Sequence, residues 1–227
     1  MNTDPRMKFP PAPRPANPAN PLRISTFGFR FWSLPLIALL LVSGCTSLFK
    51  PDPSVARHFI LTPVDTPAPV APPIALGVGR VKIPAYLYEQ SFAMRQGTNE
   101  ITYQPLLSWA ERLDTGIQRV LAADLAMALP ADPIRLSAWR HDEVTVGLYL
   151  TVDQFETDTR GHAVLAARWR LVSPDGQLLK TGQTRLTADG PAPAADAQGA
   201  VATLSRQLGE LGRAIAQSIR DLKPTPP

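Results

Sequence analysis

The chain has 227 residues, and its 23 Lys and Arg against 19 Asp and Glu give a formal net charge of +4. Five of the basic residues and one acidic residue precede position 45, so residues 45–227 carry 18 charges of each sign. The basic character of the whole chain therefore belongs to its N-terminal segment and gives no support for a nucleic-acid-binding surface, so we expect no nucleic-acid partner.

The N-terminal segment has the layout of a secretory signal peptide. An apolar run of about twelve residues begins at Phe31 and ends in two small residues directly before Cys45, the only cysteine. The alternative, a transmembrane helix with a buried cysteine, needs roughly 20 apolar residues. Leu41–Cys45 instead resembles a bacterial lipobox, with Val42 where Leu is commoner. We therefore predict cleavage before Cys45 and lipid attachment to its thiol.

The lipobox implies both the anchor and the location of the protein. Cys45 is expected to carry a diacylglycerol on sulfur and an acyl chain such as palmitate on its new N-terminus, with no other cofactor. Thr46 follows it, whereas Asp in that place favours retention in the inner membrane. The prediction is a lipoprotein anchored to the periplasmic face of the outer membrane.

The domain organisation follows from this cleavage site. We expect a signal peptide with an N-terminal extension at residues 1–44, a lipidated tether at 45–56, one domain at 57–222 and a tail at 223–227. A single domain of that length can bury an adequate core. The translation start, Met1 or Met7, stays open.

Alternating apolar residues and turn signals predict strands in the first half of the domain. A short strand is expected at Arg57–Leu61 and a longer one at Ile74–Ile83, where Pro84 stops it. Ser91–Arg95 and Ile101–Tyr103 read as a hairpin that turns at Gly97-Thr98-Asn99.

The second half is predicted to contain most of the regular structure. Strands are expected at Ile134–Trp139, Val144–Val152, Leu165–Leu171 and Gln177–Leu186, the last three as an antiparallel meander. Apolar residues at steps of three and four predict helices at Leu113–Leu129 and Gln198–Leu222. The expected fold is α+β, with a mixed, largely antiparallel sheet and two amphipathic helices on one face.

The residue patterns of common catalytic and metal sites are missing from the sequence. The three histidines have no second His or Cys at metal-ligand spacing; they are His58, His141 and His162. Asp153, Glu156 and Asp158 lack a known calcium-loop pattern and are better explained as a solvated hairpin end. We therefore predict a protein that is not an enzyme and has neither catalytic residues nor a metal site.

A stretch rich in aromatic residues follows the strand that ends at Pro84. Tyr86, Leu87 and Tyr88 follow this proline after Ala85, and we predict that they lie on an exposed loop and contact a partner. The alternative is that Leu87 and one of the tyrosines fold back over the end of the sheet. Trp109 is included in this hypothesis, with core packing as its alternative.

The same stretch resembles a known family, the PqiC-type auxiliary lipoproteins of ABC transporters. The matching features are Arg57–Leu61, Ile83-Pro84, Tyr86-Leu87, Arg95, Trp109-Ala110-Glu111 and the helix with Ile117, Val120 and Leu121. One departure is Tyr88, because family members often carry a charged residue there. The resemblance covers about Cys45 to Leu222.

The resemblance implies a function in lipid transport between membranes. The chain would be the non-catalytic, outer-membrane component that binds a periplasm-spanning MCE-domain protein and supports envelope integrity. Two alternatives stay open: a periplasmic chaperone for lipid or lipopolysaccharide, and a structural tether of the envelope. An apolar cavity of ligand size would favour the chaperone, and a packed core the adaptor. The oligomeric state, homo-oligomers included, also stays open.

Overall fold

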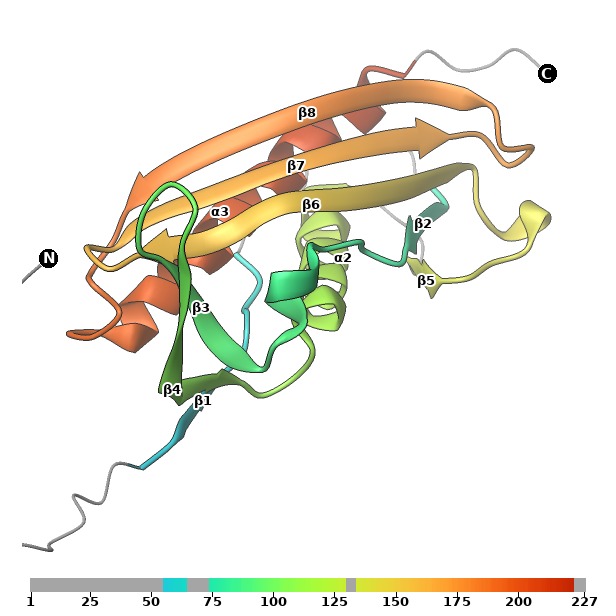
Figure 1. Ribbon diagram of the computed structural model, residues 1–227. Coiled ribbons are helices and arrows are strands. Elements are labelled where there is room, and N and C mark those ends of the chain that lie inside the picture. Colours follow the sequence, from blue (N-terminus) through green and yellow to red (C-terminus); the bar gives the residue numbers. More distant parts are fainter. Residues whose placement is uncertain (1–54, 65–73, 130–133, 223–227) are drawn as a thin grey trace, which may run out of the picture. The chain divides into compact units, whose positions relative to one another are not determined.

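The computed structural model of the protein describes residues 55–64, 74–129 and 134–222 (Figure 1). Its elements in chain order are β1 (Arg57–Phe59), β2 (Leu76–Gly79), the 3₁₀ helix η1 (Ala85–Tyr88), β3 (Ser91–Arg95), β4 (Ile101–Trp109), α2 (Leu113–Ala128), β5 (Arg135–Ser137), the 3₁₀ helix η2 (His141–Glu143), β6 (Val146–Asp158), β7 (His162–Val172), β8 (Leu178–Asp189) and α3 (Ala197–Arg220).

The described strands form one eight-stranded sheet around the long strand β6. On one side β6 pairs antiparallel with β7, which in turn pairs with β8. On its other side, the first part of β6 pairs with β2 and its last two residues pair with β3, both in parallel. The segment that links β2 to β3, which contains η1, therefore runs beside the middle of β6 (Figure 1).

Both described α-helices lie on one face of this sheet, as predicted (Figure 1). The apolar stripe of α3 is buried against β6, β7 and β8, and α2 packs against α3 and β2. Asp196 caps α3 by accepting a hydrogen bond from the Gly199 N–H at 2.9 Å, which satisfies one of the free amides of the first turn. The mixed, mostly antiparallel α+β fold is therefore confirmed.

The predicted bounds differ most from the structure in β2, β4 and β6, for identifiable reasons. β2 is shorter than predicted, because only a single bridge, Lys82 to Thr151, continues its pairing with β6. β4 runs on to Trp109 past Pro105, which lies where the register with β3 shifts. β6 runs on to Asp158, past its predicted end at Val152. The prediction stopped there because a bulge after Val152 changes which residues face the core, and this change ends the alternation in the sequence.

A buried aspartate on α2 holds the segment that follows β1. Asp124 is 2 % exposed, and its Oδ1 accepts the Val64 N–H at 2.8 Å. Its Oδ2 has no hydrogen-bond partner within the described ranges. Burial raises the pKa of Asp124 to about 6, against the opposing effects of the Val64 amide and the Arg213 charge.

We predict that Asp124→Asn removes a pH dependence of stability. A carboxyl whose pKa is higher in the folded than in the unfolded state loses stability as pH rises, here between about pH 4 and 6. Urea unfolding should show that the wild type is less stable at pH 7.5 than at pH 5, with a smaller difference in the variant. Asp153→Asn is the control, because Arg168 holds the pKa of Asp153 below its usual range. An unchanged pH difference in Asp124→Asn would contradict this account.

Candidate functional site

The segment between β2 and β3 turns sharply into η1. Pro84 is extended and its carbonyl accepts the Leu87 N–H at 3.0 Å, which starts the 3₁₀ turn. Because this helix has three residues per turn, successive side chains point in three different directions. Leu87 is 2 % exposed in the core and Tyr88 is 47 % exposed, while Tyr86 is half-buried beside the sheet.

The prediction that Tyr86, Leu87 and Tyr88 share an exposed loop is therefore wrong for two of the three, and the alternative, in which Leu87 and one tyrosine fold back, is what the structure shows. Trp109 is also in the core, 6 % exposed, with its ring centroid 5.3 Å from that of Phe92. Core packing, the alternative considered for Trp109, is what the structure shows. Tyr88 alone of these four residues lies on the surface with its side chain largely free to meet a partner.

A buried carboxylate ties η1 and β3 to β6. Arg95 donates from Nε and Nη2 to Oε1 of Glu156, both at 2.7 Å. The Tyr86 hydroxyl donates to Oε2 at 2.7 Å, and the Phe155 N–H donates to the same atom at 3.0 Å. Gln154 Nε2 adds a bond to Oε1 at 3.1 Å. Both carboxylate oxygens are thus paired, which a buried charge requires.

The Glu156 side chain is 1 % exposed, and its buried surroundings also affect the pKa of Tyr86. Burial, followed by the hydrogen bond to Glu156, raises the pKa of Tyr86 above its usual range, so its hydroxyl stays a donor. The interpretation of Glu156 as part of a solvated hairpin end is therefore wrong. Asp158 does serve the hairpin, because its Oδ1 accepts the N–H groups of Arg160 and His162 at 2.8 and 2.9 Å.

Next to this buried network, three exposed side chains form what we call the tyrosine patch: Tyr88, Tyr103 and Arg112. The Tyr103 hydroxyl donates to the Tyr86 carbonyl at 3.0 Å, and the Tyr103 side chain is 40 % exposed. The Arg112 guanidinium lies 5.2 Å from the centroid of the Tyr88 ring. Tyr and Arg are the residue types that carry much of the energy in protein interfaces.

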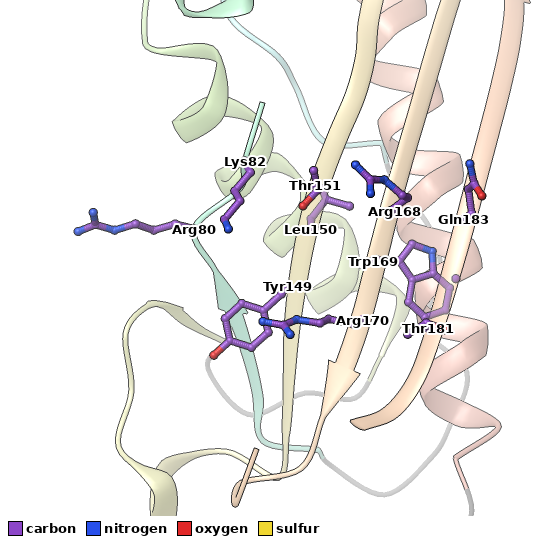
Figure 2. A pocket seen from close by; sticks show the side chains of 11 residues that line it. Arg80, Lys82, Tyr149, Leu150, Thr151, Arg168, Trp169, Arg170, Thr181 and Gln183 are labelled. Carbon is purple, nitrogen blue, oxygen red and sulfur yellow. The ribbon is translucent and has the colours of Figure 1, made fainter. Parts of the chain in front are cut away.

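A second surface lies on the sheet face opposite the helices. Here the segment after β2 and the strands β6, β7 and β8 line an open hollow of about 620 Å³, which we call the basic hollow. It contains Lys82, Arg168 and Arg170, with Arg80 at its rim (Figure 2). The sequence pattern did not predict this hollow. The outward alternation of Arg168 and Arg170 was available as a signal, but their proximity to Lys82 depends on the strand register.

The predicted lipid attachment site, Cys45, lies outside the described residues, so lipidation stays a prediction. Across residues 55–64, 74–129 and 134–222, no helix is both long and apolar enough to cross a membrane. In the same ranges, His, Cys, Asp and Glu side chains form no group of three that could ligate a metal ion.

Comparison with known proteins gives the family. Residues 60–216 match the family described as the ABC-type transport auxiliary lipoprotein component. The chain belongs to this family. The resemblance to PqiC-type auxiliary lipoproteins is thereby confirmed, and the family description makes the chain an auxiliary component of a transport system. Comparison with curated proteins gives no match.

Solved structures share the fold of this auxiliary lipoprotein. A DUF330 protein from Xanthomonas campestris has a TM-score of 0.61 at 14% identity, covering 72% of this chain and 94% of that one. Another structure, described as an uncharacterized protein, has a TM-score of 0.55 at 20% identity, covering 69% of this chain and 99% of that one. At these identities the likeness concerns the fold alone.

We predict that Arg95→Met destabilises the auxiliary lipoprotein by about 3 kcal/mol, because Glu156 is left as a buried, uncompensated charge. The matched control is Arg168→Met, which breaks a more exposed pair with Asp153 and should cost less than about 1 kcal/mol. Urea unfolding measures both.

The double variant Arg95→Met/Glu156→Met separates the charge effect from lost packing. It should be more stable than Arg95→Met alone, since both charges are then absent. A double variant that is less stable than Arg95→Met would contradict the assignment of the loss to the unpaired carboxylate.

Proposed function

We propose that the protein is a non-catalytic, outer-membrane-anchored lipoprotein of an MCE/ABC-type system that transports lipid between membranes. Its role is to bind the periplasm-spanning MCE-domain protein and so support envelope integrity. The family match over residues 60–216 carries this proposal, because it makes the chain a transport auxiliary.

The construction of the domain supports an adaptor over a lipid chaperone. The sheet and helices enclose one continuous cluster of apolar side chains, and the largest of them are fully buried, among them Phe92, Phe155 and Leu148. Four hollows on the described surface open to solvent, and charged or polar side chains contribute to each lining. A chaperone that carried lipid tails would need an apolar cavity of ligand size.

In this proposal the tyrosine patch contacts the MCE-domain protein. Its backbone is supported from beneath, because Tyr86 bonds to Glu156 and the Tyr86 carbonyl accepts the Tyr103 hydroxyl. A patch held in one conformation loses little entropy on binding. Tyr88 is the central residue, with the Arg112 guanidinium against its ring.

The anchor is tested by Cys45→Ser. The variant cannot form the thioether to diacylglycerol, so we expect it in the soluble periplasmic fraction, whereas the wild type sediments with outer membranes. Two acyl chains give stable attachment where one chain is marginal. Retention of the variant in the outer membrane, with wild-type abundance, would contradict anchoring through Cys45.

The partner surface is tested by Tyr88→Ser in a capture assay with an MCE-domain protein of the same system. We expect binding to weaken by about 2 kcal/mol, as at an interface hot spot, while the melting temperature hardly changes. Leu178→Ser is the matched control, because Leu178 is 62 % exposed on β8, outside the tyrosine patch. Equal capture by both variants would remove the tyrosine patch from the interface.

A further inference from the structure

Strand pairing sets the positions of the side chains in the basic hollow. Lys82 in the segment after β2, Thr151 on β6, Arg168 on β7 and Gln183 on β8 are successive partners, so their side chains share one face of the sheet. The neighbouring row across β6, β7 and β8 places Arg170 between Tyr149 and Thr181. The strand register therefore fixes the backbone position from which each cationic side chain extends.

Aromatic packing orients one of these cations. The Arg170 guanidinium lies 4.9 Å from the centroid of the Tyr149 ring (Figure 2). The ring can lie there because β2 has Gly79 beside it, where an added Cβ would come within 2.8 Å of Tyr149 Cδ1. Trp139 packs against the same ring at a centroid distance of 6.0 Å. The cation is thus supported on a fixed platform.

The charges of the hollow are unbalanced, although residues 45–227 are neutral as a whole. Arg168 is paired with Asp153, its Nη2 lying 2.7 Å from Oδ1. Within the described part of the chain, no acidic group lies within salt-bridge distance of Lys82 or Arg170. Arg80 adds a further positive charge, although its side chain points away from the other cations (Figure 2). The hollow therefore attracts anions.

The donors around this charge match a phosphate group. Guanidinium groups present fixed pairs of N–H donors that fit two phosphate oxygens, and Lys adds a compact charge. The hydroxyls of Thr151 and Thr181 and the amide of Gln183 add neutral donors at the same surface. A hollow of about 620 Å³ has the size of a small-molecule site. Its open form suits a headgroup whose tails lie outside.

We propose that the basic hollow binds the phosphate-containing headgroup of an anionic phospholipid. This inference rests on the proposed function, which places the protein beside lipid in transit. Tyr149 supports a lipid over a soluble anion, because an exposed ring that is polar at one end suits the boundary between headgroups and tails. The compact convergence of cations supports a headgroup over an extended acidic protein segment.

The test uses the mature lipidated protein held in nanodiscs of phosphatidylcholine. Short-chain dihexanoyl phosphatidylglycerol is titrated in, and the tryptophan fluorescence reports binding, since Trp139 packs against Tyr149. Dihexanoyl phosphatidylcholine, glycerophosphoglycerol and a glutamate-rich peptide serve as comparison probes. The key variant is Lys82→Gln/Arg170→Gln. The matched control, Arg57→Gln/Arg135→Gln, removes the same charge from exposed positions outside the hollow.

We expect saturable binding of the phosphatidylglycerol, at least about tenfold weaker in Lys82→Gln/Arg170→Gln because two charge-assisted contacts are lost, and nearly unchanged in the control. The phosphatidylcholine and glycerophosphoglycerol probes should bind more weakly than the anionic lipid. Unchanged melting temperatures show that the variants are folded.

Four outcomes would overturn the inference. They are no saturable lipid binding, equal loss in the control variant, glycerophosphoglycerol binding as tight as the lipid, and displacement of the lipid by the acidic peptide. The titration contains no MCE-domain protein, so it stands apart from the capture assay. Lipid binding without capture would refute only the proposed function, and capture without lipid binding would refute only this inference.

Discussion

The ion pair between Arg95 and Glu156 is the contact on which the outer side of the domain depends. Glu156 lies on the middle strand of the sheet, yet it faces away from the helices and is covered by η1 and β3. A carboxylate in that place is tolerated only because both oxygens are paired. The same bonds fix η1 beside β6, so Leu87 enters the core and Tyr88 stays outside.

The two faces of the sheet therefore have different roles. The inner face and the helices hold nearly all of the buried apolar side chains and provide the stability. The outer face holds the basic hollow near the start of β6 and Glu156 near its end, where Glu156 holds Tyr86 beneath the tyrosine patch. In the proposed role, the tyrosine patch and the basic hollow can be occupied without rearranging the core, because both consist of side chains outside it.

The sequence predicts the elements well and the surfaces poorly. The long helices and the meander are readable because a period of 3.6 or 2 repeats over many residues. The directions in which Tyr86, Leu87 and Tyr88 point cannot be read from the sequence, because a single 3₁₀ turn leaves no repeated pattern. The pairing of Arg95 with Glu156, 61 residues apart, and of Lys82 with Thr151 depends on register, which has no local signal in either strand.

The bulge in β6 reverses which residues of the strand face the core. Before it, even-numbered residues such as Leu148 and Leu150 enter the core; beyond it, odd-numbered residues such as Phe155 do so. Straightening the bulge without removing a residue, so that Asp153 pairs with Ala166, would exchange the faces of the distal half and send Phe155 outward and Glu156 toward the helices. The one extra residue therefore keeps Glu156, which holds Tyr86 beneath the tyrosine patch, on the same face of β6 as Thr151 of the basic hollow.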